Sequence, residues 1–341
     1  MRTHLGRLGC LWLAANILPA FSPQHAQAAE AVPRVQAVGC IALTVQDLDR
    51  SLGWYQHVLD AKPLGREREE EGEALERRTG IFAAHTRSRQ LAIGQECLEL
   101  TEFLAQKGRP APTDSHSNDR WFQHVAIVVA DMDRAYGRVK AARVEFASAS
   151  PQRLPDWNPG AGGIRAFYFK DPDHHVLELI WFPVGKGQPA WQRREGGAVF
   201  LGIDHTAIAV DDTDRALRFY RDVLGLRESG HSENWGPEQE RLNGVFGAHL
   251  RITQVRAPGG PGIELLEYLT PRDGRPYPAD ERASDLIHWH TTVVAGDLAS
   301  LTRALLAART EFVSLPATPQ DPKPPVRVRD PDGHVVEVVN P

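Results

Sequence analysis

The chain contains an internal repeat, and this repeat constrains its fold more than any other feature of the sequence. The stretch Asp171–Glu178 returns as Asp330–Glu337, with the same Asp-Pro-Asp turn and the same closing glutamate. The Gly-Arg-Pro triplet at 108–110 returns at 274–276. Both offsets stay at about 160 residues, which indicates that one half of the chain was copied once. Polar residues kept at matching positions in both copies are therefore candidates for chemistry.

Length and composition place the chain among ordinary globular proteins. Its 341 residues are enough for roughly two domains with cores of their own. Hydrophobic residues make up 42% and charged residues 24%, which is typical of a soluble protein. A net charge of -5 and a pI of about 6.3 give no basic field for nucleic acid, so we expect no nucleic-acid partner.

The N-terminus has the three regions of a secretory signal peptide. Two arginines precede the apolar run Leu8–Phe21, which is followed by the small-residue sequence Ala26-Gln27-Ala28. We predict a signal peptide at 1–28 with cleavage after Ala28, and a periplasmic or secreted mature protein. The apolar run is too short for comfortable spanning, so no stable membrane insertion is expected after cleavage. An uncleaved membrane anchor is the alternative.

Each half of the chain divides again into two modules. Short β-branched and apolar runs, typical of buried strands, begin at Cys40, His124, His205 and His290. Segments with helical spacing follow them, among them Met132–Ala142 and Leu298–Ala308. The last strand-like run of each module carries a glutamate between apolar residues. The sequence therefore predicts the order strand, helix and three strands, four times over.

Aligned modules bring out two recurring polar positions. The position on the first strand reads Cys40, His124, His205 and His290, and the position on the last strand reads Glu99, Glu178, Glu264 and Glu337. One such glutamate alone is more often solvent-exposed than a ligand. Four at equivalent positions, three of them matched by a histidine, favour a ligand role. Imidazole nitrogens and carboxylate oxygens together suit Zn, Ni, Co, Mn or Fe(II).

From about Val38 to Asn340 the chain resembles the vicinal oxygen chelate superfamily, which includes glyoxalase I, methylmalonyl-CoA epimerase, extradiol dioxygenases and bleomycin or fosfomycin resistance proteins. The resemblance rests on the fourfold recurrence of these motifs. It implies an α+β fold in which paired βαβββ modules form cupped sheets around a divalent metal. We accordingly expect an N-terminal domain at 36–184, a linker at 185–199 and a C-terminal domain at 200–341.

The resemblance also implies a set of metal ligands. The later copy has the full set, so we expect His205, Glu264, His290 and Glu337 to hold one divalent ion, with Glu337 or Glu264 as the catalytic base. The earlier copy has Cys40 where a histidine would stand. Its remaining residues Glu99, His124 and Glu178 would form, with Cys40, a possible vestigial second site.

The two cysteines of the mature chain have alternative fates. Cys97 lies two residues before Glu99, so it should face the same side of its strand as the expected cavity. If the first and last strands of a module are neighbours, as the family implies, Cys40 and Cys97 could form a disulfide. Two buried free thiols are the other interpretation.

Glu264 separates the reactions that the family resemblance suggests. Two histidines and two glutamates suit proton transfer next to a carbonyl, because one glutamate can move the proton while the ion stabilises charge. A ring-cleaving dioxygenase needs only two histidines and one carboxylate. The predicted function is isomerase or lyase chemistry on a small molecule with vicinal oxygens. An extradiol-type dioxygenase and a non-catalytic small-molecule binder are the alternatives, in a monomer or homodimer.

Export and loop composition add further expectations. Glutathione and coenzyme A thioesters belong to the cytosol, so a small hydroxy-carbonyl compound or a sugar-like polyol suits an exported enzyme better. The polar segment Asn234–Glu240 lines a substrate mouth or is a plain loop. His288 shares a strand face with His290 and would either support a metal ligand from behind or contact the substrate. His175 and His334 follow tight turns and are expected to be exposed.

Overall fold

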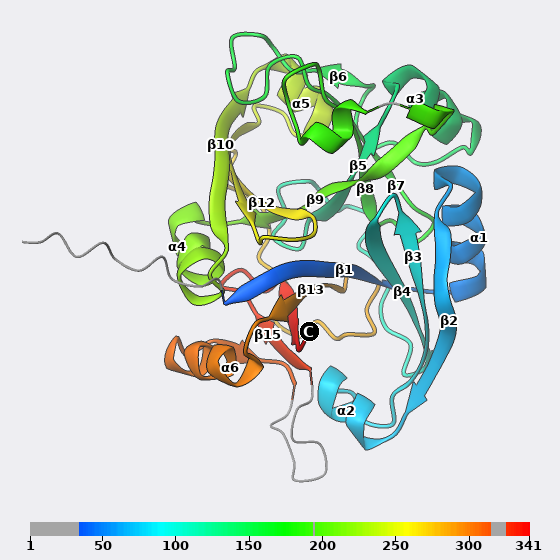
Figure 1. The fold of residues 1–341 in the computed structure, drawn as a ribbon, viewed down its shortest axis with the longest axis vertical. Helices are drawn as coiled ribbons and strands as arrows, with labels where there is room; N and C mark the ends of the chain where they lie inside the picture. Colours follow the sequence, from blue (N-terminus) through cyan, green and yellow to red (C-terminus); the bar gives the residue numbers. More distant parts are fainter. Residues whose placement is uncertain (1–33, 194, 315–324) are drawn as a thin grey trace, which may run out of the picture. The chain divides into compact units, whose positions relative to one another are not determined.

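Two eight-stranded β-sheets form the framework of the protein (Figure 1). The computed structural model describes residues 34–193, 195–314 and 325–341, which belong to one compact unit. The signal peptide predicted at 1–28 lies outside the described residues. In the part of the chain that the structure describes, no helix combines the length and the apolar character needed to cross a bilayer.

The elements follow the predicted modular order. The first module contains β1 (Val35–Val45), α1 (Leu48–Leu59), β2 (Lys62–Glu71), α2 (Glu73–Thr79), β3 (His85–Ile93) and β4 (Glu96–Ala105). The second contains β5 (Gln123–Val129), α3 (Met132–Ala141), β6 (Gln152–Arg153), β7 (Arg165–Lys170) and β8 (Val176–Trp181). The third contains β9 (Phe200–Val210), α4 (Thr213–Leu217), a π-helical turn (Arg218–Val223), β10 (Arg227–Trp235), α5 (Pro237–Asn243), β11 (His249–Arg256) and β12 (Gly262–Thr270). The fourth contains β13 (Trp289–Ala295), α6 (Leu298–Ala307), β14 (Glu311–Phe312), β15 (Val326–Arg329) and β16 (Val335–Val339).

The α+β fold of four strand–helix–three-strand modules is confirmed, but the modules do not pair in sequence order. One sheet runs β14-β15-β16-β13-β1-β4-β3-β2, and the other runs β10-β11-β12-β9-β5-β8-β7-β6. The first module thus shares a sheet with the fourth, and the second with the third. Residues 36–184 and 200–341 each contribute to both sheets. The linker at 185–199 therefore separates two copies of the sequence but not two sheets.

Antiparallel pairing of first strands joins the modules. β1 pairs with β13 in one sheet, which we call sheet A, and β5 pairs with β9 in the other, sheet B. Within each module the first strand also lies parallel to the last strand, so the four central strands of each sheet are two first strands flanked by two last strands. This arrangement brings all the recurring polar positions to the sheet centres.

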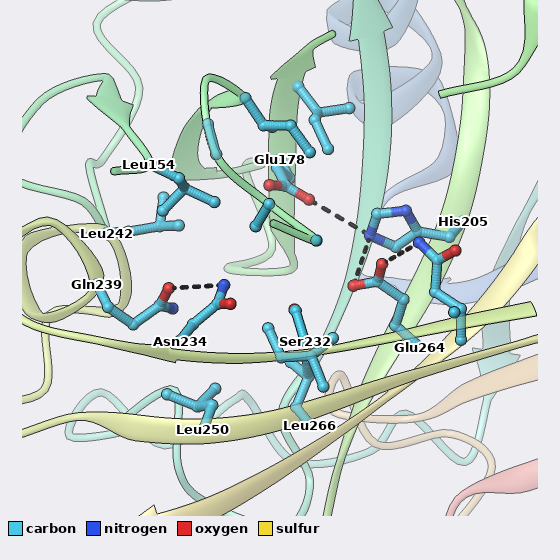
Figure 2. A pocket seen from close by; sticks show the side chains of 18 of the residues that line it. Leu154, Glu178, His205, Ser232, Asn234, Gln239, Leu242, Leu250, Glu264 and Leu266 are labelled. Carbon is cyan, nitrogen blue, oxygen red and sulfur yellow. Dashed lines mark hydrogen bonds and ion pairs between the residues drawn. The ribbon is translucent and has the colours of Figure 1, made fainter. Parts of the chain in front are cut away.

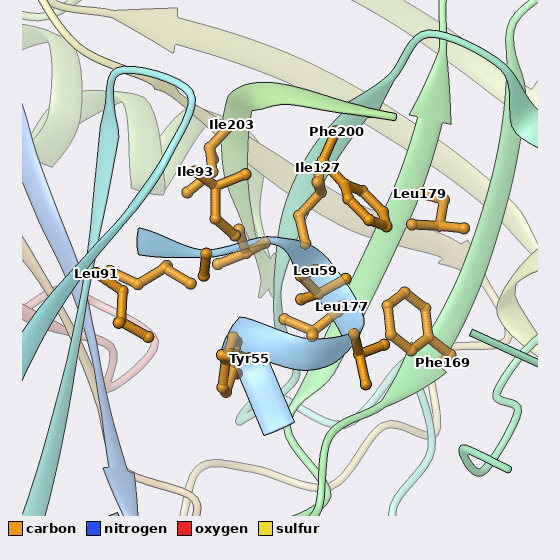
Figure 3. Close-up of a cluster of buried hydrophobic side chains, with 14 of the residues drawn as sticks. Tyr55, Leu59, Leu91, Ile93, Ile127, Phe169, Leu177, Leu179, Phe200 and Ile203 are labelled. Carbon is orange, nitrogen blue, oxygen red and sulfur yellow. The ribbon is translucent and has the colours of Figure 1, made fainter. Parts of the chain in front are cut away.

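The largest hydrophobic core lies between the two sheets. It combines side chains of β1, β3 and β4 with side chains of β5, β7 and β8, together with α1 and α3. Tyr55 and Leu59 of α1 lie among Leu91 of sheet A and Leu177 of sheet B (Figure 3). Fully burying one such leucine side chain contributes about 1.5–3 kcal/mol. The core thus holds the two sheets in a fixed relation.

The repeated Gly-Arg-Pro triplets form a reciprocal clasp between the linker that follows β4 and the linker that follows β12. The backbone N–H, Nε and Nη2 of Arg109 donate to Asp285, and the same groups of Arg275 donate to Asp119. Backbone hydrogen bonds from Arg120 to Arg275 and from Leu286 to Arg109 accompany them. The linkers approach so closely that a Cβ added to the glycine at 274 would lie 1.8 Å from the carbonyl oxygen of Asn118. This close approach explains why the triplet was kept in both copies.

Candidate metal centre

Strand register in sheet B places four ligand-type side chains on one face. Each glutamate pairs with the residue that follows a histidine by two positions, Glu178 with Ala126 and Glu264 with Ala207. Residues two apart on a strand point to the same side of the sheet. The four central strands β8, β5, β9 and β12 therefore present Glu178, His124, His205 and Glu264 to a common space.

The four side chains converge. Nε2 of His124 lies 3.1 Å from Oε2 of Glu178. Nε2 of His205 lies 3.5 Å from the same oxygen and 3.3 Å from Oε2 of Glu264 (Figure 2). One ligand atom from each of His124, Glu178 and His205 lies within 4.8 Å of the others, and these three residues are buried. Glu264 joins this trio through His205.

The donor set fits a divalent metal ion. Both ring nitrogens of His124 and Nε2 of His205 are buried without an aligned hydrogen bond to any described residue, although the two Nε2 atoms lie 3.1–3.5 Å from carboxylate oxygens. Buried polar atoms in native proteins are normally paired, so such atoms need an explanation, for which an ion is one candidate. Two imidazoles with one or two carboxylates form a set suited to zinc and its neighbours in the first transition row.

Asp204 fixes the orientation of His205. Its Oδ2 lies 3.0 Å from Nδ1 of His205, which leaves Nε2 to face the glutamates. Asp204 itself accepts hydrogen bonds from Trp191 Nε1 at 2.8 Å and from Arg256 Nη2 at 2.8 Å. A carboxylate behind a ligand histidine commonly sets its tautomer and ring direction. Trp191 belongs to the segment between the two copies, so that segment also supports the site.

Electrostatics in the cluster are dominated by negative charge. Burial disfavours the charged form of His205, but the carboxylates of Glu264, Asp204 and Glu178 outweigh it and raise its pKa to about 10. Burial likewise raises the pKa of Glu178, but the imidazoles of His124 and His205 outweigh that effect and hold this pKa below its ordinary value. The carboxylates of Glu178 and Asp204 thus remain ionised and attract positive charge to His205.

A cavity of about 290 Å³ opens next to the cluster. Glu178, His205 and Glu264 form one end of its wall, and Gln254 donates to Oε1 of Glu264 at 2.5 Å. The rest of the wall is a mixture of aliphatic side chains and neutral polar groups, including Asn234. The segment expected at 234–240 either to line a substrate mouth or to be a plain loop therefore lines the cavity.

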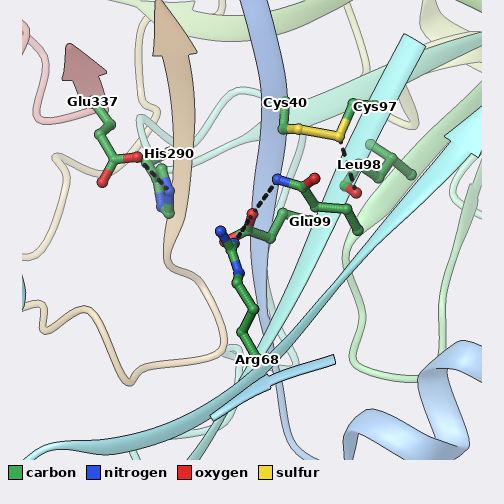
Figure 4. Close-up of a disulfide and its surroundings, with 8 residues drawn as sticks. Cys40, Arg68, Cys97, Leu98, Glu99, His290 and Glu337 are labelled. Carbon is green, nitrogen blue, oxygen red and sulfur yellow. Dashed lines mark hydrogen bonds and ion pairs between the residues drawn. A yellow bond between two sulfur atoms is a disulfide. The ribbon is translucent and has the colours of Figure 1, made fainter. Parts of the chain in front are cut away.

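The corresponding face of sheet A has different contents. Cys40 and Cys97 form a disulfide with an S–S distance of 2.02 Å, so the second interpretation, two free thiols, is wrong (Figure 4). Nη2 of Arg68 donates to Oε2 of Glu99 at 2.7 Å. Nε of Arg327 donates to Oε1 of Glu337 at 2.8 Å. Guanidinium groups thus stand where a cation would be held.

Arg327 also constrains the remaining histidine of sheet A. Its Nη2 lies 3.3 Å from Nε2 of His290. Burial, followed by the charges of Arg327, His288 and Arg78, holds the pKa of His290 well below its ordinary value. The sheet A residues do not fit a metal ion, because a fixed positive charge contacts both His290 and Glu337.

The predicted ligand set is therefore divided between the two sheets. His205 and Glu264 lie in the sheet B cluster, whereas His290 and Glu337 lie in sheet A. They were expected to converge because they belong to one copy of the sequence. Pairing of β5 with β9 instead brings in His124 and Glu178, which were assigned to a vestigial site. The other members of that set, Cys40 and Glu99, lie in sheet A.

Several other histidines differ from expectation. His175 and His334, expected to be exposed, are 2% and 4% exposed. Nδ1 of His175 pairs with Asp171 at 2.8 Å, and Nε2 of His334 pairs with the carbonyl oxygen of Ala209 at 3.0 Å. Both histidines thus anchor the tight turns before the last strands. His288 pairs with buried Glu281 at 2.6 Å, so it belongs to a buried ion pair on the sheet A side.

Sequence reasoning missed Asp204 and Gln254 as supports of the site. Asp204 directly precedes His205, and an acidic residue beside a ligand histidine is a signal that was available. Gln254 lies opposite Glu264 on the neighbouring strand β11. That pairing follows from the hairpin register and is not visible from residue types alone.

Comparisons with known proteins agree with this architecture. The family model described as "Glyoxalase/Bleomycin resistance protein/Dioxygenase superfamily" matches residues 37–179 and 202–338. A 2-epi-5-epi-valiolone epimerase from Actinomyces sp is 32% identical over 158 residues, which cover 45% of this chain and 84% of that protein. The lactoylglutathione lyase GLX1 of Arabidopsis thaliana is 26% identical over 207 residues, and the match spans 61% of this chain and 60% of that relative. The crystal structure of glyoxalase I from Zea mays superimposes with a TM-score of 0.60 at 18% identity, covering 89% of this chain and 92% of that chain.

Proposed function

This chain belongs to the glyoxalase, bleomycin resistance protein and dioxygenase superfamily, and on that basis we propose that it is a metal-dependent enzyme of proton transfer. The reaction would be an isomerisation or a lyase reaction on a small molecule with vicinal oxygens. The observation that carries the proposal is the convergence of His124, Glu178, His205 and Glu264 beside a cavity. The names of the two relatives, an epimerase and a lyase, support the same reaction classes.

His124, Glu178 and His205 would hold the ion, because they form the tightest group of ligand atoms. A divalent ion there would supply Lewis-acid stabilisation for negative charge developing on two neighbouring substrate oxygens. Glu264 stands next to this trio and lines the cavity. Its Oε1 is held by Gln254, which leaves Oε2 facing the cluster.

Glu264 is accordingly the proposed base. It would take a proton from the carbon next to a substrate carbonyl and return a proton to the same carbon or to its neighbour. One C–H bond breaks and one forms, so the step needs neither an oxidant nor a reductant. Glu337, the other base considered from the sequence, is paired with Arg327 in sheet A and has no part in this step.

The substrate class that suits the cavity is a small hydroxy-carbonyl compound. The lining includes hydroxyl and amide side chains but no lysine or arginine that would pair with an anionic conjugate. The export predicted from the N-terminal sequence would also favour this class, since glutathione and coenzyme A are cytosolic. The Cys40–Cys97 disulfide supports export in turn, because disulfides persist mainly in oxidising compartments.

Solvent-deuterium exchange tests the proposal without the natural substrate. Metal-loaded protein in D2O is incubated with a panel of small 2-hydroxyketones, and deuterium at the carbon next to the carbonyl is followed by NMR. We expect Glu264→Gln to slow exchange by about 10²–10⁴-fold, the usual contribution of a general base. Glu99→Gln, at the equivalent position in sheet A, is the matched control and should exchange at the unaltered rate. Full exchange by Glu264→Gln with retained metal would remove this mechanism.

A second function is favoured by one specific observation. The trio His124, Glu178 and His205 alone is a two-histidine, one-carboxylate set, which suits an Fe(II) dioxygenase. Metal analysis of protein purified from its own host separates the candidates. Near-stoichiometric Zn, Ni, Co or Mn supports proton transfer. Iron together with ring cleavage of catechols under O2 would support the dioxygenase, and protein without metal would support a binder.

A further inference from the structure

The cavity has a second polar end, away from the metal cluster. Asn234 of β10 and Gln239 of α5 line it there, and both side chains are at most 5% exposed. Figure 2 shows them on the opposite side of the cavity from His205 and Glu264, and aliphatic side chains such as Leu250 and Leu266 also line this cavity. A ligand held by the cluster would therefore extend along an apolar wall towards these two amides.

Asn234 and Gln239 belong to a chain of hydrogen-bonded side-chain amides that begins at Asn158. Backbone groups fix the orientation of the Asn158 amide. Oδ1 of Asn158 accepts from the backbone N–H groups of Gly160 and Ala161, both at 3.0 Å. Its Nδ2 donates to the carbonyl oxygen of Glu233 at 3.2 Å and to Oδ1 of Asn234 at 2.6 Å. A backbone N–H can only donate and a carbonyl can only accept, so the Asn158 amide cannot be turned over.

The remaining amides follow in one direction. Nδ2 of Asn234 donates to Oε1 of Gln239 at 3.1 Å, and Nε2 of Gln239 donates to Oδ1 of Asn243. Nδ2 of Asn243 then donates to the hydroxyl of Tyr268 at 2.6 Å. Each amide nitrogen carries two hydrogens. Asn234 and Gln239 therefore each keep one N–H beyond the chain, while each of their oxygens already accepts a hydrogen bond.

The hydrogen bonds already made by Asn234 and Gln239 determine which ligand groups this end of the cavity would recognise. Spare N–H groups require an acceptor, and the oxygen of a hydroxyl, ether or carbonyl group is one. The amides are neutral, and the cavity lining contains the carboxylates of Glu178 and Glu264 without a lysine or arginine. A carboxylate at the far end, away from the metal cluster, would be buried beside neutral amides without a lysine or arginine partner among the described lining residues. The hydroxyls of Ser229 and Ser232 add further neutral hydrogen-bonding groups.

We propose that Asn234 and Gln239 form an oxygen-recognition subsite that selects an uncharged, multiply hydroxylated cyclic ketone. This inference rests on the proposed function, since the vicinal oxygens of the substrate would lie at the metal cluster. The ring would contact the aliphatic wall, and a distal hydroxyl would accept from the two amides. The first module has Glu70 and Leu75 at the aligned positions, so it lacks this pair of amides.

Equilibrium binding to the zinc-loaded full chain tests the subsite with three probes. Inosose, a pentahydroxycyclohexanone, carries distal hydroxyls, whereas 2-hydroxycyclohexanone lacks them and dehydroquinate adds a carboxylate. Isothermal titration should show inosose binding at least about tenfold more tightly than either of the others, as expected when buried donors lose their acceptor. Equal affinity for inosose and 2-hydroxycyclohexanone, or tighter binding of dehydroquinate, would overturn the proposal.

Variants assign the selectivity to the amides. Gln239→Glu keeps the shape of the side chain and removes its donors, so the preference for inosose should fall to about twofold or less. Gln152→Glu is the matched control, because Gln152 is a buried amide outside the cavity lining. An unchanged preference in Gln239→Glu also contradicts the subsite. If that variant melts early, the probe comparison in the unaltered chain still decides.

Deuterium exchange with the same probes separates this inference from the proposed function. Selective binding of inosose without exchange at its carbon would refute proton transfer and leave the subsite standing. Exchange with inosose and 2-hydroxycyclohexanone at equal efficiency and equal affinity would support proton transfer and refute the subsite.

Discussion

The clasp between the linkers after β4 and β12 should contribute measurably to the free energy of unfolding. Asp285 is 2% exposed and accepts four hydrogen bonds: from the backbone N–H, Nε and Nη2 of Arg109 at 2.7, 3.1 and 2.7 Å, and from the backbone N–H of Arg282 at 3.1 Å. Asp285→Ala removes the acceptor for all four and leaves two backbone donors to find water or remain unpaired. We expect the variant to fold with a clearly lower free energy of unfolding.

The magnitude follows from these contacts. Breaking a buried charged pair by removing one partner costs about 3–5 kcal/mol, but the Arg109 side chain is 52% exposed, so the lower end applies. We expect a loss of about 3 kcal/mol from Asp285→Ala. Asp285→Asn keeps part of the hydrogen bonding and should cost about 1–2 kcal/mol. For a compact unit of this size, a loss of about 3 kcal/mol lowers Tm by about 5 °C.

Urea unfolding followed by circular dichroism, together with calorimetry, measures both quantities. Asp280→Ala is the matched control: Asp280 also accepts from Arg109, at 2.8 Å, but its side chain is 77% exposed. An exposed pair of this kind contributes about 0–1 kcal/mol. Asp119→Ala, on the other side of the clasp, should resemble Asp285→Ala. Equal losses in Asp280→Ala and Asp285→Ala would refute the reasoning, because burial would then have no bearing on the cost.

Three further predictions concern other polar contacts. Asp204→Asn should weaken metal binding by about 10–100-fold in a chelator competition, without changing the cavity, because it loosens the support of a ligand histidine. Burial raises the pKa of Glu281, but the adjacent imidazole and guanidinium outweigh it and lower the pKa to about 2 from an ordinary 4.5. The stabilisation by ionised Glu281 is therefore present above pH 4.5 and is lost as the pH falls towards 2. Above pH 4.5 the unaltered chain should exceed Glu281→Gln in unfolding free energy by about 3 kcal/mol. This difference should shrink as the pH is lowered to 2. Ala216→Ser should raise the free energy of unfolding in urea by about 1 kcal/mol. In the first copy the equivalent residue is Ser51, whose hydroxyl donates to Oδ2 of Asp173. The equivalent Oδ2 of Asp332 is buried without a hydrogen bond from any described residue, so the new hydroxyl would supply one.

The sequence predicted the modules because their signals are local. A buried apolar strand, an acidic helix start and an Asp-Pro-Asp turn each act over a few residues. Asp47 accepts from the backbone N–H of Arg50 at 2.8 Å, and Asp212 accepts from that of Arg215 at 2.7 Å, as capping aspartates do. Alternation along the strands then placed each glutamate on the same face as its histidine-type residue.

The grouping of the ligands was not predictable from the same signals. Alignment of modules shows which residues are equivalent, but it does not show which first strands will pair. Pairing the first module with the second or with the fourth buries similar apolar faces. Contacts between distant segments favour the observed choice, among them the bonds of Arg109 to Asp285 and of Arg275 to Asp119. Such contacts join residues far apart in sequence, so they can be identified only from the three-dimensional structure.

One sequence signal could nevertheless have set the fourth module apart from the third. Each cluster glutamate faces one residue on the neighbouring hairpin strand: Gln90 opposite Glu99, Tyr168 opposite Glu178, Gln254 opposite Glu264 and Arg327 opposite Glu337. The connection before the final strand is two residues long in the first module and five in each of the others. Such short connections limit the possible register, so these partners are within reach of sequence analysis.

The charge on that partner separates the fourth module from the second and third, whereas Glu99, whose partner Gln90 is neutral, is paired with Arg68 instead. Tyr168 and Gln254 are neutral, so Glu178 and Glu264 keep a net negative charge beside His205. Arg327 instead neutralises Glu337 with its own positive charge. A duplicated scaffold with the same glutamates can therefore attract a metal ion in one sheet and exclude it from the other. Replacing the guanidinium, as in Arg327→Gln, would remove that exclusion locally, but the Cys40–Cys97 disulfide would still occupy the place of the second histidine.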